Sequence, residues 1–230
     1  MRKQQKIWLE EHVSKGALPT MADAEPAVEV VMFADWLKER NILPPAKVID
    51  IGCGKGRHAV YMASLGYQVY AMDYIEAAVE AAKKLAELKV VAGKITFQVA
   101  AIDREWPFED NFFDIAIDSF SSVDIETRQG REVYRDEMMR TLEPGGCALV
   151  RAASTEDEWE KELIAKSPGK ELNSTYWPQT GKFQKDYDEA ELREFYKDFE
   201  ILELRTITKP TSKLGRNYTA TNFWVVLRKR

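Results

Sequence analysis

The chain has 230 residues, of which 45% are apolar, 11% aromatic and 31% charged, and its formal net charge is −5. This length suffices for a sizeable core in one or two domains, and aromatic residues spread along the whole chain argue against a long disordered tail. The acidic balance argues against nucleic acid as the main ligand, because the one dense basic cluster is Arg228-Lys229-Arg230.

The first two thirds of the chain predict strands that alternate with helices. Pro26 precedes an amphipathic helix over 27–40, and Val48-Ile49-Asp50-Ile51 is a short strand of the buried kind. In order, the next expected elements are a helix over 57–65, a strand over 68–72, a helix with an apolar face from Ile75 to Leu85, strands over 95–99 and 112–117, a helix that ends at Pro144-Gly145-Gly146, and a strand over 147–152. This alternation predicts a parallel sheet with both faces covered by helices.

The pattern changes in the last third. Residues 155–188 are polar and are expected to be irregular, and residues 190–196 are expected to be helical. Two apolar segments, 199–207 and 222–227, are joined by a stretch that contains Pro210 and Gly215. Two late strands so close together predict an antiparallel pair at the edge of the sheet.

A glycine-rich loop, Gly52-Cys53-Gly54-Lys55-Gly56, lies between a buried strand and a helix. Glycines there let the backbone approach a ligand, and the start of the next helix offers free N–H groups. Asp73 ends the second strand 21 residues after Gly52, close to the spacing of an acid that accepts ribose hydroxyls. A ribose-bearing nucleoside is therefore the expected ligand. A plain tight turn remains the alternative for the glycines, and a helix N-cap remains the alternative for Asp73.

Four stretches resemble the class I S-adenosylmethionine-dependent methyltransferases. They are residues 48–56 with the glycine loop, the strand-end Asp73, residues 106–114 (WPFEDNFFD), and residues 140–146 (RTLEPGG). The last stretch is the most specific, because a dinucleotide-binding protein would not require it. Residues 54–59 also fit the dinucleotide pattern GxGxx(G/A), but the glycines begin one residue too early.

The resemblance implies a Rossmann-like three-layer α/β sandwich with a mostly parallel seven-stranded sheet and an antiparallel C-terminal edge pair. It implies one methyltransferase domain over 1–230, with an N-terminal helical lid (1–44), a cofactor-binding core (45–153), and a part that carries the substrate wall and the final two strands (154–230). The implied activity is methyl transfer from S-adenosyl-L-methionine to a small molecule, which leaves S-adenosyl-L-homocysteine. The alternative is a non-catalytic module that binds S-adenosylmethionine for regulation, and a nicotinamide-dependent reductase is a third interpretation.

The resemblance also assigns cofactor contacts residue by residue. The glycines would line the methionine moiety, Asp50 would help to hold its amino group, and Asp73 would bind the ribose hydroxyls. The expected cofactor-binding residues are Asp50, Gly52, Cys53, Gly54, Gly56, Asp73, Tyr74, Ile102, Asp103 and Asp118. Asp103 lies one position nearer to Pro107 than is usual in the family, so the Ile102 backbone is the alternative for the adenine contact.

No catalytic residue is assigned from the sequence. Candidates are Asp118 after the fourth strand, His58 in the first turn after the glycine loop, and His12, which follows Trp8 in a segment like the N-terminal lid of small-molecule methyltransferases. A loop cap, a helix surface and an ordinary surface helix are their respective structural alternatives. Tyr176-Trp177-Pro178 and Phe183 are candidates for the substrate wall.

Within the family, the chain is most similar to the small-molecule branch that contains the tellurite-resistance and thiopurine enzymes. Residues 208–216 lack the His-Arg pair of the tellurite enzymes, and no Asn-Pro-Pro-Tyr run follows the fourth strand, where Asp118-Ser119-Phe120-Ser121 stands. We therefore expect a small-molecule partner and no metal, nucleic-acid or membrane partner. Cys53 and Cys147 form no CxxC pair, and no stretch resembles a signal peptide or membrane span, which predicts a cytoplasmic protein. The sequence does not predict the oligomeric state.

Overall fold

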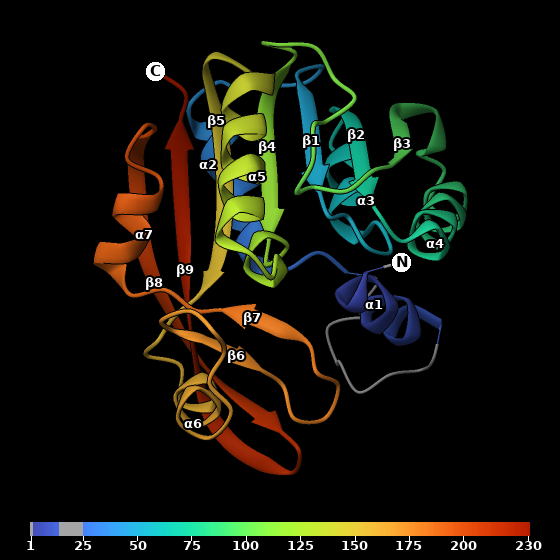
Figure 1. Ribbon diagram of the computed structural model, residues 1–230. Coiled ribbons are helices and arrows are strands. Elements are labelled where there is room, and N and C mark those ends of the chain that lie inside the picture. Colours follow the sequence, from blue (N-terminus) through green and yellow to red (C-terminus); the bar gives the residue numbers. More distant parts are fainter. Residues whose placement is uncertain (1, 14–24) are drawn as a thin grey trace.

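A computed structural model describes residues 2–13 and 25–230 (Figure 1). The described residues form a seven-stranded sheet in the order β3-β2-β1-β4-β5-β9-β8. The strands are β1 (Lys47–Ile51), β2 (Gln68–Asp73), β3 (Ile95–Val99), β4 (Phe113–Ser119), β5 (Leu142–Ala153), β8 (Glu200–Lys213) and β9 (Arg216–Arg228). Strands β1 to β5 pair in parallel, whereas β9 runs antiparallel to β5 and to β8. The expected mostly parallel sheet with an antiparallel edge pair is confirmed.

Helices cover both faces of this sheet. They are α2 (Val28–Glu39), α3 (Arg57–Ser64), α4 (Glu76–Leu88), α5 (Arg128–Thr141) and α7 (Glu189–Phe195), with one-turn helices η2 (Ala92–Lys94) and η3 (Ser122–Asp124) in the loops. A further helix, α1 (Lys3–Val13), lies beyond the carboxyl ends of β1 and β2 (Figure 1). The part of the chain that the structure describes contains no helix long and apolar enough to cross a bilayer.

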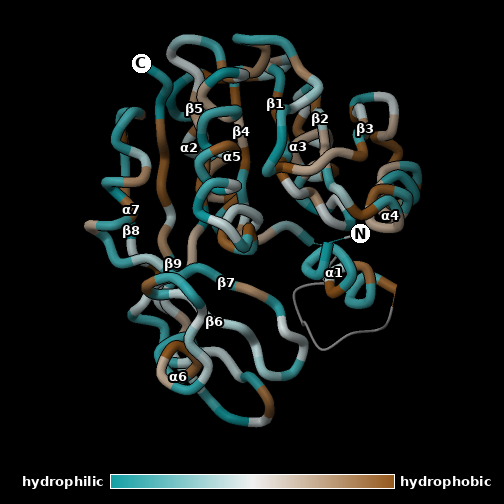
Figure 2. Tube along the Cα trace, viewed as in Figure 1, coloured by the Kyte–Doolittle hydropathy of each residue, from teal (hydrophilic) through white to brown (hydrophobic). Residues whose placement is uncertain are grey.

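The core is split into two layers by the sheet. One layer packs α2 and α3 on the sheet with Phe33, Leu37 and Met62 fully buried. The other packs α5 and α7 with Tyr134 and Tyr196 buried. Brown, hydrophobic segments lie in strands of the sheet in Figure 2, as expected for strands buried on both faces. Helix α2 lies within residues 1–44, which were expected to form an N-terminal helical lid. Its buried side chains make it part of the core.

The structure corrects three expectations, two of them about the last third. Residues 155–188 are not irregular: they form α6 (Glu158–Lys166) and a small antiparallel sheet of β6 (Ser174–Tyr176) and β7 (Phe183–Lys185). Asp157 begins α6 by accepting the N–H groups of Trp159 and Glu160, a cap pattern visible in the sequence.

Strands β8 and β9 are much longer than the apolar segments that predicted them. The connecting turn is Leu214-Gly215, and Pro210 lies inside β8, opposite Thr219. Proline is tolerated there because β8 is an edge strand. The third correction concerns Pro144-Gly145-Gly146, which lies within β5 instead of ending α5. The far ends of β8 and β9 extend past the main sheet and meet α6 and the β6–β7 sheet (Figure 1).

Candidate active site

The glycine loop lies at the carboxyl end of β1, between the strand and α3. Gly52, Gly54 and Gly56 have φ angles of 66°, 52° and 83°, a region that other residues rarely adopt. A Cβ at Gly52 would collide with the Ser121 side chain, whereas one at Gly54 would meet His12 Cε1 at 3.8 Å. The loop therefore requires glycine for its own turn and for the close approach of neighbouring segments.

Replacing Gly56 with alanine is expected to destabilise the fold by about 1–3 kcal/mol, because the new Cβ would lie 2.7 Å from Ala82 Cβ and the backbone would keep a positive φ. Gly93→Ala is the matched control, since an added Cβ there meets no atom within 4 Å among the described residues. Urea unfolding should show a change of no more than about 0.5 kcal/mol for the control. Equal stability of the two variants would contradict this account of the loop.

Asp73 joins the glycine loop to the end of β2. Its Oδ2 accepts the Gly54 N–H at 2.9 Å, and its Oδ1 accepts the Ile75 N–H at 2.8 Å. The side chain is 6% exposed, and this burial raises the pKa of the carboxyl above its usual range, although the backbone donors oppose the shift. Asp73 thus fixes the loop beside the start of α4. It is not the N-cap of that helix, which is Ile75, and each of its oxygens retains a lone pair for a ligand hydroxyl.

Two more carboxylates are buried at the same sheet edge. Asp50 Oδ2 accepts the Ala59 N–H of α3 at 3.0 Å, and burial together with the charges of Asp73 and Asp118 raises the pKa of Asp50 to about 7. Asp118 accepts the Ser121 N–H and the Tyr134 hydroxyl, both at 2.7 Å. It is fully buried, which raises its pKa. Asp118 therefore holds the β4–η3 turn, and its contact with a cofactor or substrate stays a prediction.

The candidates for the adenine contact lie in the loop after β3. Asp103 forms an ion pair with Arg2, which precedes α1, and the Ile102 carbonyl accepts the Trp106 indole N–H at 3.0 Å. Tyr74 follows Asp73, and burial raises the pKa of its hydroxyl. The Tyr74 carbonyl accepts from Gln5 at 3.3 Å. The structure thus brings these candidates together with the N-terminal segment.

Helix α1 covers the glycine loop through His12. Burial, and secondly the charge of Lys55, lower the pKa of His12 to about 4, so its ring is neutral at physiological pH. Its Nδ1 is buried without a hydrogen-bond partner in residues 2–13 and 25–230. The Trp8 ring lies 6.4 Å from the His12 ring, centroid to centroid. The arrangement agrees with a lid and leaves an unpaired ring nitrogen above the loop.

His58 has a different place. Its Nε2 accepts the Ala27 N–H at 3.3 Å, where α2 begins, and its side chain is buried. Burial, reinforced by Arg57 and Arg151, holds the pKa of His58 well below its ordinary value. His58 thus joins α3 to α2. Because it is buried, the alternative of an exposed helix surface is wrong, and a role toward a ligand stays a prediction.

Sequence reasoning did not single out Ser121, whose Oγ donates to the Gly52 carbonyl at 3.2 Å. Its place in the first loop after β4 is the sequence feature that could have marked it. In the structure it follows Phe120, which has an unusual positive φ of 68°. Strained residues of this kind gather at functional sites. The Cys53 thiol, which was among the expected cofactor contacts, is buried, and this burial raises its pKa well above the usual value.

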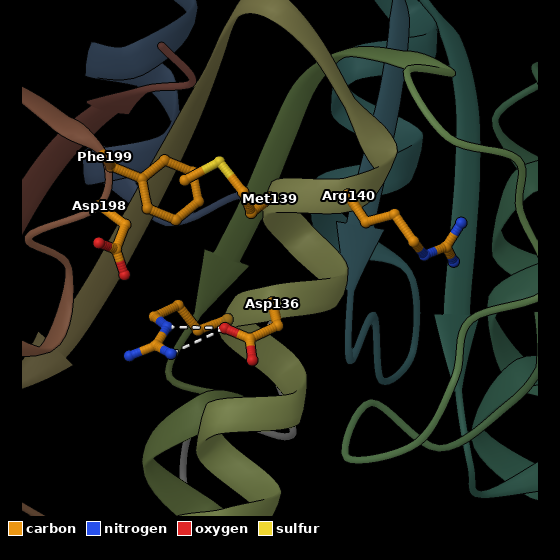
Figure 3. Close-up of a pocket in the computed structure, with 6 residues that line it drawn as sticks. Asp136, Met139, Arg140, Asp198 and Phe199 are labelled. Atoms are coloured by element: carbon orange, nitrogen blue, oxygen red, sulfur yellow. Dashed lines mark hydrogen bonds and ion pairs between the residues drawn. The ribbon is translucent and has the colours of Figure 1, made fainter.

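A surface hollow elsewhere on the molecule is not part of this site. Its volume is about 240 Å³, and it is lined by Arg135, Asp136, Met139, Arg140, Asp198 and Phe199 (Figure 3). Arg135 is paired with Asp136 at 2.8 Å. The hollow lies where α5 ends and β8 begins, at the amino edge of the parallel strands, whereas ligands of such sheets bind at the carboxyl edge.

Comparison with known proteins agrees with this geometry. A family model described as a methyltransferase domain matches residues 48–146. A 2-heptyl-1-hydroxyquinolin-4(1H)-one methyltransferase of Mycobacteroides abscessus is 30% identical over 167 residues, which cover 70% of this chain and 69% of that protein. The probable S-adenosyl-L-methionine-dependent methyltransferase TehB of Haemophilus influenzae is 25% identical over 175 residues, or 75% of this chain.

The fold is shared with solved structures as well. The crystal structure of a SAM-dependent methyltransferase from Methanosarcina mazei superposes with a TM-score of 0.71 at 24% identity, covering 84% of this chain and 96% of that one. The sheet order and the glycine loop define a Rossmann-like α/β protein of the class I kind. The chain belongs to the S-adenosylmethionine-dependent methyltransferases. It spans 52% of the length of the Haemophilus relative.

The residues present fit S-adenosylmethionine, the methyl donor of this family. That molecule carries two positive groups, the sulfonium and the amino group, and Asp50, Asp73 and Asp118 gather close enough for their charges to interact at the glycine loop. Burial raises the pKa of each of these carboxyls, because it takes the charged form out of water. A cationic ligand bound beside them would stabilise the charged form.

Proposed function

We propose that this chain transfers a methyl group from S-adenosylmethionine to a small-molecule acceptor. The observation that carries the proposal is the glycine loop itself: three glycines with positive φ, held by Asp73 at the carboxyl edge of the sheet and covered by α1. The relative from Mycobacteroides, whose name gives a hydroxyquinolone as its substrate, supports a small ring compound as acceptor.

In the proposed site, Asp73 binds the ribose hydroxyls, and the Gly52, Gly54 and Gly56 backbone lies along the methionine moiety. Asp50 and Asp118 contribute negative charge near the cationic end, with Cys53 beneath. Tyr74, together with Ile102 or Asp103, contacts the adenine.

When bound, S-adenosylmethionine supplies a methyl group activated by a positively charged sulfur, for transfer by in-line displacement. The protein's part is to align the acceptor about 3–3.5 Å from the methyl carbon and to exclude water, and such positioning contributes about 7–11 kcal/mol in favourable cases. Helix α1 contributes the cover, with the neutral His12 ring above the loop.

Incubation of the protein with methyl-labelled S-adenosylmethionine and a panel of thiol, amine, carboxylate and phenol acceptors is expected to give S-adenosylhomocysteine and one labelled product in equal amounts. Mass spectrometry of both products checks the balance. Tight binding of S-adenosylhomocysteine with no transfer to the panel or to cell extracts would favour a binding module instead. Stabilisation by NAD(H) and not by S-adenosylhomocysteine would overturn the proposal.

We also propose a cytoplasmic location and no nucleic-acid partner. Cys53 and Cys147 are free thiols and both are buried, which is in keeping with a reducing compartment. The net charge of −5 opposes binding to a polyanion.

A further inference from the structure

Four aromatic side chains gather beyond the glycine loop in what we name the tryptophan cluster: Trp8, Trp159, Trp177 and Tyr218, of which Trp159 and Tyr218 are buried and the other two half-buried. Trp159 of α6 lies 6.1 Å from Trp177 and 5.2 Å from Tyr218, centroid to centroid, in edge-to-face contacts. Trp8 of α1 joins through Lys182, whose ammonium lies 5.3 Å from the Trp8 ring and 4.6 Å from the Trp177 ring. The cluster thus draws on α1, α6, the β6–β7 turn and β9.

Lys182 and Asp124 form an ion pair in this cluster. Lys182 Nζ lies 3.1 Å from Asp124 Oδ1 and 3.2 Å from Gln184 Oε1. The Lys182 side chain is 8% exposed and that of Asp124 is 13% exposed. A second lysine, Lys213, pairs with the buried Glu160 at 3.3 Å. Two ammonium groups therefore lie against aromatic faces, Lys182 buried and Lys213 26% exposed, and taking such charges out of water is costly.

Several polar atoms of the cluster have no partner. Within the described residues, these buried atoms lack a hydrogen bond: Trp159 Nε1, Trp177 Nε1, Tyr218 OH, Glu160 Oε2 and Asp186 Oδ2. Trp159 is 6% exposed, Glu160 3% and Asp186 0%. Buried polar atoms in folded proteins nearly always have partners, so five together indicate a missing ligand or water.

The Lys182–Asp124 end of the cluster lies toward the glycine loop. Lys182 contacts Trp8, Trp8 contacts His12, and His12 reaches Gly54. Asp124 lies in η3 after β4, and its charge acts on the Tyr74 hydroxyl at the end of β2. These contacts link the Lys182 end of the cluster to the glycine loop through Trp8 and His12.

Helix α1 can give access to the cluster at low cost. Of its eleven residues, Gln4 and Glu11 are buried, and both are polar. Gln4 accepts the Phe183 N–H at 3.0 Å and donates to the Gly181 carbonyl at 3.2 Å. A helix attached by hydrogen bonds, with little apolar burial, separates more easily than one that packs into the core.

Resting on the proposed function, we propose that the tryptophan cluster binds the acceptor. The acceptor is a planar ring compound with an acidic hydroxyl. Asp124 takes the hydroxyl proton, and Lys182 holds the oxyanion that remains. Flat aromatic walls favour a planar ring, and the indole N–H groups of Trp159 and Trp177 are donors that suit its ring oxygen or carbonyl.

The step balances. The hydroxyl O–H bond breaks, and its proton goes to the Asp124 carboxylate. The oxygen forms a bond to the methyl carbon as the carbon–sulfur bond breaks, and that electron pair stays on sulfur. Asp124 then returns its proton to solvent. Asp124 is suited to this exchange because burial, with the charges of Asp118 and Glu160 and against the charge of Lys182, raises its pKa to about 6.

The test uses 4-nitrophenol, whose ionised form is coloured, on the full chain with S-adenosylhomocysteine bound. Near neutral pH we expect the ratio of phenolate to neutral phenol to be at least about tenfold higher for bound than for free 4-nitrophenol. The reason is that a nearby ammonium favours the anion by about one pKa unit or more. Lys182→Met should abolish the colour change, and Lys182→Arg should keep it. Lys161→Met, on the exposed side of α6, is the matched control and should bind as the parent does.

Asp124→Asn gives a second, independent readout. Removing the carboxylate that competes for Lys182 should strengthen nitrophenolate binding several-fold, while it slows methyl transfer to unsubstituted phenol, which is un-ionised near neutral pH and must lose its proton. General damage to the fold would not produce this split. This variant and Lys182→Arg keep the proposal testable if Lys182→Met does not fold.

An unchanged phenolate fraction in a folded Lys182→Met variant, or tighter binding of cationic 4-nitrobenzylamine than of 4-nitrophenol, would overturn the inference. Calorimetry with S-adenosylhomocysteine separates it from the proposed function. Cofactor binding without nitrophenol binding contradicts the acceptor site alone, whereas absence of cofactor binding contradicts the proposed function.

Discussion

Asp73→Ala should weaken the binding of S-adenosylhomocysteine by about tenfold or more, measured as Kd by isothermal titration calorimetry. A charge-assisted contact between a carboxylate and ribose hydroxyls is worth about 1.5–3 kcal/mol. The same carboxylate holds the Gly54 and Ile75 amides, so its removal also frees the glycine loop. Both effects act in the same direction on affinity.

Two variants separate the effects on affinity. Asp73→Asn keeps one oxygen for a backbone amide but loses the charge, and its affinity should fall between those of the parent and the alanine variant. Asp110→Ala is the control, because its side chain is 69% exposed and pairs with Arg140 near the end of α5. A Kd that does not change in a folded Asp73→Ala protein would remove Asp73 from the cofactor site.

Arg151→Met is expected to destabilise the protein by about 3–5 kcal/mol in urea unfolding. Arg151 Nη2 lies 2.9 Å from Glu29 Oε2, and each side chain is 5% exposed. The variant would leave the Glu29 carboxylate buried, with Lys209 as its remaining cationic partner at 3.3 Å. Lys209 is 53% exposed, so its charge is screened by solvent and replaces little of what is lost.

The double variant Glu29→Met/Arg151→Met should recover most of that stability, since no uncompensated charge remains in the core. The exposed pair of Arg193 and Glu189 in α7 is the reference, and Arg193→Met should cost at most about 1 kcal/mol. A loss of the same size for Arg151→Met and Arg193→Met would show that the buried pair has no special weight.

The parallel part of the fold could be predicted because its signals are local. Val48–Ile51 is an apolar run too short for a helix, and the glycine loop that follows interrupts the chain at once. Apolar spacing likewise marks the faces of α4 and α5, and the structure has helices at both places. Such signals depend on a few neighbouring residues.

The last third was predicted less well because its elements depend on distant partners. Strands β6 and β7 have three residues each and exist by pairing with each other and by packing near η3 and α6. Pro210 suggested a loop, but a proline is compatible with the outer edge of β8, and only the strand order shows that β8 is the edge.

The candidate site divides in the same way. The glycine loop and Asp73 were predicted from spacing, and the structure places them in contact, whereas the N-cap of α4 is Ile75 and not Asp73. His58 was placed correctly on a helix, but which way it faced depended on α2, far from it in the chain. Lys182 carried no signal of its own in the sequence and became a candidate only through its neighbours.

The order of residues by itself determined the alternation of strands and helices, the glycine loop, and the acid that follows the second strand, because each is specified by backbone preferences and apolar spacing over a few turns of chain. Only the tertiary structure decided which carboxylates are buried, that Arg151 neutralises Glu29, and that Lys182 meets Asp124 beside Trp8 and Trp177. Burial and charge pairing are set by residues brought together from far apart in the chain, and a linear pattern contains no record of those distances.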